Sequence, residues 1–162
     1  MSNVWPPTPS APNAQAAPVA TRAATAADTA LLIVRLAVAL PFIFHGAQLA
    51  FVAFGGPGLA GFAKMGHQPL PVAALIAYGE FLGGLGVLFG VLTRPASTGI
   101  LIIMLGAIVL VHLPHGYDSQ KQGFEYPLTH VFLTIALLIA GPGAYAAWSL
   151  IGRPRPDKPI LQ

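Results

Sequence analysis

Two ionisable side chains, Arg35 and Glu80, lie inside stretches of the sequence that are otherwise apolar. A charged group exposed to lipid is costly, so we expect each side chain to face the interior of a helical bundle, with a partner or water. One interpretation is a buried ion pair between them that fixes the register of two helices. The other is functional: Glu80 accepts protons, and Arg35 orients or neutralises it.

Histidines provide a second group of candidates. His45 lies near the end of the first apolar stretch, and His130 lies about one turn into the last, close to Glu125. Imidazoles and a carboxylate beside aromatic rings are what a membrane quinone or phenol needs, because they exchange protons with its ring oxygens. The aromatic candidates are Phe42, Phe44, Phe51, Phe81 and Tyr126. We predict Glu80, His45 and Arg35 as catalytic residues and His112, His130 and Glu125 as cofactor-binding residues.

Haem or a metal ion is the alternative cofactor. His112 and His115 are three residues apart, a spacing that suits a ligand pair on one helical face. Pro114 lies between them and is expected to end the helix. We therefore assign no metal-binding residue and keep quinone as the predicted cofactor.

The composition excludes a soluble globular domain. The chain has 162 residues, of which 55% are hydrophobic, with 8 Lys and Arg and 5 Asp and Glu. A soluble domain carries charge on roughly a quarter of its residues. The absence of cysteine excludes disulfides, thiolate-held iron–sulfur clusters and c-type haem attachment. A net charge of +3 gives no support to nucleic-acid binding.

Four apolar stretches can each cross a hydrocarbon core about 30 Å thick, which takes roughly 20 helical residues. A segment of this length that crosses lipid must form its backbone hydrogen bonds within itself, as a helix does. We therefore predict an all-α integral membrane four-helix bundle over residues 29–146. A disordered Ala/Pro-rich tail at 1–28 and a short Pro-rich tail at 147–162 flank it. The predicted spans are about Ala30–Ala53, Leu70–Leu92, Ala96–Leu113 and Tyr126–Ala144.

The distribution of basic residues predicts orientation. An even number of spans places both termini on one side of the membrane, and the side richer in Lys and Arg faces the cytoplasm. That side would carry Arg22, Arg94, Arg153, Arg155 and Lys158, against Lys64 and Lys121 opposite. We therefore expect cytoplasmic termini.

Glycines mark one face of the second span. Gly79, Gly83, Gly86 and Gly90 recur at helical spacing. Small residues at this spacing let a neighbouring helix approach closely, so we predict that the stripe mainly serves packing.

These residues together resemble the DoxX-like family of small four-helix bacterial membrane proteins. The motifs are Arg35 followed by His45-Gly46, the segment from Gly79 to Gly84 around Glu80, Thr93-Arg94 after the second span, Gly123-Phe124-Glu125, and Gly141-Pro142-Gly143. The resemblance covers about residues 30–145. It implies a bacterial inner-membrane protein linked to quinone-reducing thiosulfate oxidation, to quinone-like compounds or to oxidant defence. Many relatives have a Lys soon after the His-Gly pair, whereas this chain has Gln48.

Three functions follow as hypotheses. The first is a quinone-linked oxidoreductase component that works with a partner subunit. The second is a scaffold or accessory subunit that docks a larger membrane complex through its glycine face. The expected partner is a subunit of such a complex or, alternatively, further copies in a homo-oligomer. The third is a pathway for protons or a small solute, since buried polar residues often line water.

Overall fold

The computed structural model describes residues 25–147 and 149, and over this part of the chain the fold is all-α, without a strand. The predicted all-α class is confirmed. The predicted tails lie, apart from residues 25–28, 147 and 149, outside the described residues. The helices are α1 (Ala26–Phe51), α2 (Gly58–Met65), α3 (Leu70–Phe89), α4 (Thr93–Ala107) and α5 (Glu125–Ala140). A π-helical turn (Ile108–His112) and a 3-10 turn (Leu113–His115) extend α4, and further 3-10 turns occupy Ala53–Gly55 and Ser119–Lys121.

The first helix begins earlier than predicted, because a capping box starts it. Thr25 Oγ1 accepts from Asp28 N at 3.3 Å, and Asp28 Oδ2 accepts from Thr25 N at 2.8 Å. Residues 26–28 therefore form the first turn of α1 and do not belong to the predicted tail. Asp28 Oδ1 also accepts from Ala144 N at 3.0 Å, which ties the start of α1 to the segment that follows α5.

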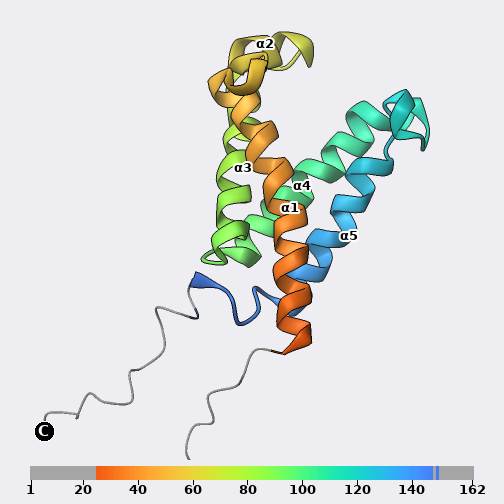
Figure 1. The fold of residues 1–162 in the computed structure, drawn as a ribbon. Helices are drawn as coiled ribbons and strands as arrows, with labels where there is room; N and C mark the ends of the chain where they lie inside the picture. The colour runs from red at the N-terminus through yellow and green to blue at the C-terminus, as the bar shows by residue number, and fades with distance from the viewer. Residues whose placement is uncertain (1–24, 148, 150–162) are drawn as a thin grey trace, which may run out of the picture.

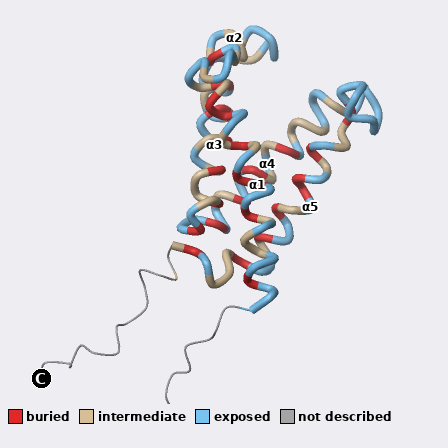
Figure 2. The backbone as a smooth tube through the Cα atoms, in the orientation of Figure 1, coloured by how far each residue is buried: buried red, intermediate tan, exposed pale blue. Residues whose placement is uncertain are grey.

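Three helical segments among the described residues are long and apolar enough to cross a membrane: α1, α3 and Thr93–His115. The fourth predicted span corresponds to α5, which is apolar but has only 16 residues. Exposed positions recur along all of these helices (Figure 2). Many of the exposed residues are large and apolar, for example Ile33, Leu75, Ile102 and Ile139. Such a surface suits lipid as its solvent.

The helices pack as two antiparallel pairs (Figure 1). α3 runs beside α1, α5 runs beside α4, and the α4–α5 pair leans away from the α1–α3 pair toward the end that carries α2. The described ends of the chain, residue 25 and residues 141–147, lie at the opposite end. One apolar core joins α1, α3, α4 and α5, and it consists of Val38, Ala39, Phe42, Val87, Ile100, Met104, Val131 and Leu137.

Glycines set the close approaches between helices. The three glycines at positions 79, 83 and 86 pack toward α4: a Cβ on them would lie 3.2, 3.3 and 3.1 Å from the side chains of Ile103, Ile100 and Ala96. The predicted packing role is confirmed for these three. Gly90 has a different role, because its φ of 69° places it in the left-handed conformation that ends α3.

The connection after α1 contains a helix that the sequence did not predict. Val52 and Phe54 adopt left-handed backbone conformations, with φ of 59° and 55°, and stop α1. The Phe54 ring stacks on Phe44 with centroids 4.7 Å apart, which holds this turn against α1. The short amphipathic helix α2 follows and caps the α1–α3 pair (Figure 1).

Candidate functional site

An acid–imidazole pair joins α1 and α3. His45 of α1 and Glu80 of α3 meet through Nδ1 and Oε2 at 2.6 Å, and with an ionised carboxylate the ring N–H donates this hydrogen bond. The side chain of Glu80 is 3% exposed, whereas that of His45 is 56% exposed. The carboxylate is therefore enclosed, and the imidazole connects it to the surface of the bundle.

The close crossing of α1 and α3 explains how these two side chains meet. Gly46, next to His45, packs on the backbone of Phe81, next to Glu80, and a Cβ there would lie 2.8 Å from Phe81 Cα. Gly84, one turn further along α3, also packs closely on α1, because a Cβ there would lie 2.9 Å from the backbone nitrogen of Ile43. The two glycines let the helix axes approach until an imidazole reaches a carboxylate.

Arg35 does not pair with Glu80, so the predicted ion pair and the predicted role of Arg35 in orienting the carboxylate are wrong in this structure. Arg35 Nε donates to Val87 O at 2.9 Å, Nη2 donates to Leu88 O, and Nη1 donates to Pro142 O at 3.3 Å. Val87 and Leu88 belong to the last turn of α3, seven and eight residues beyond Glu80.

The physical reason is the end of α3. The last carbonyls of a helix have no partner within it and carry partial negative charge, so a buried cation placed there stabilises them. Arg35 is 1% exposed and supplies that cation. Gly90 makes room for it, because a Cβ at this position would lie 2.8 Å from Arg35 Nη2. The arginine thus fastens α1 to α3 and to the Gly141-Pro142-Gly143 turn.

His130 of α5 is held against α1 by aromatic contacts. Its ring packs edge-on against Phe42 of α1, with centroids 5.3 Å apart, and lies 4.4 Å from the ring of Tyr126. His130 Nδ1 donates to Tyr126 O at 3.0 Å, while Nε2 is buried and has no hydrogen-bond partner among the described residues.

The other two residues predicted to bind a cofactor are held by the loop before α5. His112 Nδ1 donates to Gln122 O at 2.6 Å, and Glu125 Oε2 accepts from Ser119 N at 3.2 Å. The structure does not gather them with His130 into one ligand set. Over the described part of the chain, no group of three His, Asp or Glu side chains is arranged to hold a metal ion.

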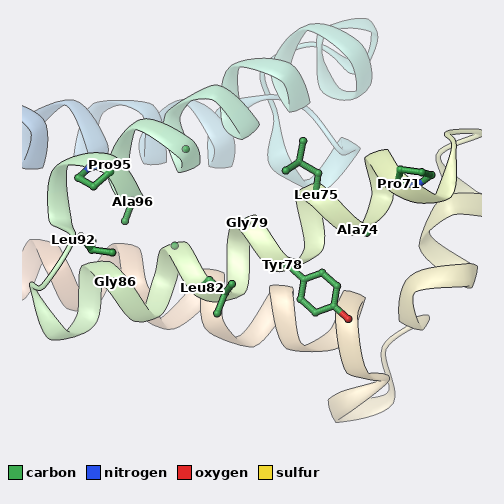
Figure 3. Close-up of a pocket in the computed structure, with 12 residues that line it drawn as sticks. Pro71, Ala74, Leu75, Tyr78, Gly79, Leu82, Gly86, Leu92, Pro95 and Ala96 are labelled. Carbon is green, nitrogen blue, oxygen red and sulfur yellow. The ribbon is translucent and has the colours of Figure 1, made fainter.

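A separate apolar groove runs between α3 and α4 (Figure 3). Its volume is about 760 Å³. Small residues form much of its walls. Tyr78 is a lining residue whose ring points toward α1 (Figure 3), where it packs edge-on against Phe51 with centroids 5.8 Å apart. Glu80 and His45 are not among the lining residues. The groove and the acid–imidazole pair are therefore different surfaces of the molecule.

The fold defines a small helical membrane protein in which a buried carboxylate on one apolar helix contacts an exposed imidazole on another. The chain belongs to the DoxX family, whose family model matches residues 30–113. No solved structure matches the chain significantly.

Two curated relatives are similar to it. An uncharacterized protein of Haemophilus influenzae is 30% identical over 76 residues, which cover 47% of this chain and 50% of that protein. An uncharacterized membrane protein of Mycobacterium tuberculosis is 33% identical over 134 residues, which cover 74% of this chain and 78% of that protein. The chain thus spans half the length of the first relative and about four-fifths of the second.

Proposed function

We propose that this DoxX-family membrane protein is a quinone-linked oxidoreductase component that works with a partner subunit supplying the electrons. The observation that carries the proposal is the His45–Glu80 hydrogen bond, in which a carboxylate enclosed by the bundle contacts an imidazole that is 56% exposed. An acid–base pair of this kind can take and return protons at the surface of a membrane protein.

The surroundings of the pair favour a ligand that dissolves in lipid. His45 lies within α1, which is apolar and long enough to cross a membrane. A ligand that reaches its exposed face from the bilayer must be largely apolar and must still carry groups that exchange protons. Quinones and phenols meet both requirements, and the exposed ring of Tyr126 offers aromatic surface on α5, which contacts α1.

Each residue then has a distinct role. His45 passes a proton between the ligand and Glu80, and Glu80 holds that proton inside the bundle. Arg35 is a positioning residue, because it fixes the end of the helix that carries Glu80. A bound quinone would supply the redox chemistry, which these side chains cannot perform themselves.

The proposed site of action is the bacterial inner membrane, with α5 as a shorter fourth span and both termini in the cytoplasm. The hydrogen bond between Asp28 and Ala144 supports termini on one side, because it joins the start of α1 to the segment after α5. Arg94, at the start of α4, lies at the same end, as the positive-inside rule requires of a cytoplasmic face.

The test uses the full chain in liposomes with a short-tailed ubiquinone or menaquinone analogue. We expect saturable binding, and we expect Glu80→Gln to lower proton-coupled turnover when the natural partner is present. Asp118→Asn is the matched control, because it likewise replaces a carboxylate by an amide, but at an exposed loop position. Absence of both quinone binding and any redox effect of Glu80→Gln would refute the proposal.

A scaffold function is the second candidate, and the α3–α4 groove favours it. Gly99 lines this groove, and a Cβ there would meet nothing within 4 Å among the described residues. Packing within the chain therefore does not require this glycine, although a helix-interior glycine costs about 0.5–1 kcal/mol. A stoichiometric partner that is lost in Gly99→Leu, with turnover insensitive to Glu80→Gln, would favour this candidate.

A further inference from the structure

The groove between α3 and α4 is uncharged and almost wholly apolar. Tyr78 is the one lining residue whose side chain carries a polar atom, and the lining residues Leu75, Leu82 and Leu92 are exposed. Its volume of about 760 Å³ lies within the range of about 300–1,000 Å³ that ligand sites have. In a bilayer such a groove is filled by a lipid chain or by a protein helix, because water is excluded from it.

The length of the groove suits a lipid chain. Its lining residues on α3 run from Pro71 to Gly86, about 22 Å along the helix axis. One leaflet is half of the hydrocarbon core, about 15 Å deep. Figure 3 shows Pro71 at one end of the groove and Leu92 and Pro95 at the other. A chain that enters from the Leu92 end can therefore lie in the groove through a whole leaflet.

A positive charge lies at the Leu92 end of the groove. Arg94 stands in the sequence between the lining residues Leu92 and Pro95, in the first turn of α4. It is exposed, and among the described residues its side chain pairs with no acid. A guanidinium binds a phosphate through two parallel N–H donors. A cation next to an apolar groove complements a lipid that has an anionic head group.

The glycines of the groove favour a lipid over a second helix. The glycine stripe of α3 is already occupied, because α4 packs on it. Gly99 of α4 is open, but the residues four positions before and after it are Pro95 and Ile103. The open face of α4 therefore lacks the pair of small residues, four apart, through which membrane helices approach closely.

We propose that the α3–α4 groove binds one acyl chain of an anionic phospholipid and that Arg94 binds the phosphate of this lipid. The site is a different surface from the His45–Glu80 pair, so the inference does not depend on the proposed function. The scaffold candidate requires a protein helix in the same groove, and the bound lipid excludes that helix.

The test measures lipid selectivity with the full chain in phosphatidylcholine vesicles. The probes are spin-labelled phosphatidylglycerol and spin-labelled phosphatidylcholine with identical chains, and the motionally restricted fraction of each label gives its relative association constant. We expect the unmodified chain to prefer phosphatidylglycerol. Arg94→Gln should lower this preference about fivefold, the contribution of one basic side chain at a membrane surface. Lys64→Gln is the matched control, because it removes an exposed cation at the opposite end of the helices.

A second variant tests the groove itself. Gly99→Leu should remove one motionally restricted lipid per chain, because the new side chain fills the groove and a Cβ there meets nothing within 4 Å among the described residues. Gly106→Leu is the matched control. A Cβ at this position of α4 is equally free of contacts, but the residue does not line the groove.

Three results would overturn the inference. Equal association of the two lipids with the unmodified chain would do so without any variant, even if a variant fails to fold. So would a preference that survives Arg94→Gln, or an equal effect of Gly99→Leu and Gly106→Leu. A Gly99→Cys chain that forms a disulfide-linked dimer in the presence of excess phosphatidylglycerol would assign the groove to a second copy instead.

Discussion

Double-mutant cycles on Arg35, His45 and Glu80 test how the intramembrane charges are connected. In the structure, Glu80 bonds His45, while Arg35 bonds the carbonyls at the end of α3. The nearest of these, Val87 O, lies seven residues beyond Glu80, about 10 Å along the helix axis. Residues this far apart without a shared partner change stability almost independently.

The expected magnitudes follow from the bonds that each change removes. Arg35 makes three hydrogen bonds to backbone carbonyls. At about 0.6–1.7 kcal/mol for each interhelical bond in a membrane protein, Arg35→Met should lower the free energy of unfolding by about 2–5 kcal/mol. The changes in the free energy of unfolding caused by Arg35→Met and by Glu80→Gln should add to within about 0.5 kcal/mol. The changes caused by His45→Phe and by Glu80→Gln should instead show a coupling energy of about 0.5–3 kcal/mol.

The assay is reversible unfolding by sodium dodecyl sulfate in mixed micelles, followed by far-UV circular dichroism, for the unmodified chain, the three single variants and the two double variants. Asp118→Asn is the control, and it reports how much a surface carboxylate contributes to the free energy of unfolding under the same conditions. A coupling between Arg35 and Glu80 as large as that between His45 and Glu80 would refute the assignment of Arg35 to the end of α3.

Three further changes test the packing and the limits of the site. Gly46→Val should separate α1 from α3, because its side chain would collide with the Phe81 backbone, and it should reduce both melting temperature and quinone binding. Gly90→Ala should destabilise the protein by more than 1 kcal/mol, measured by the same unfolding assay, since the position has a φ of 69° and faces Ala146. His112→Ala should leave the Kd for the quinone analogue within about twofold, because its ring bonds the loop.

Hydropathy and turn residues were sufficient to predict the long helices. α1 and α3 begin and end within a few residues of the predicted spans. About 20 successive apolar residues are long enough to cross the bilayer, and in lipid such a segment forms a helix. The ends were less predictable. Thr25 and Asp28 form a capping box inside an Ala/Thr-rich stretch that reads as a tail, and the 8 residues of α2 are too few to register as a span.

The partners within the site depended on information that a single sequence does not carry. Arg35 binds backbone carbonyls, which every residue has, so no side chain marks the position of its partners. The meeting of His45 with Glu80 depends on how far α1 is rotated against α3, and Gly46 and Gly84 set that rotation jointly. Both glycines are apparent in the sequence, but their packing role can be recognised only when the position of the neighbouring helix is known.

The three hydrogen bonds of Arg35 also bear on how the chain is inserted into the membrane during synthesis. The first acceptor of the guanidinium follows it by 52 residues and the last by 107. When α1 is synthesised, its buried cation therefore has none of its final partners, and it needs water or lipid headgroups until α3 and the Gly141-Pro142-Gly143 turn are in place. A chain that stops before this turn lacks the third acceptor, Pro142 O.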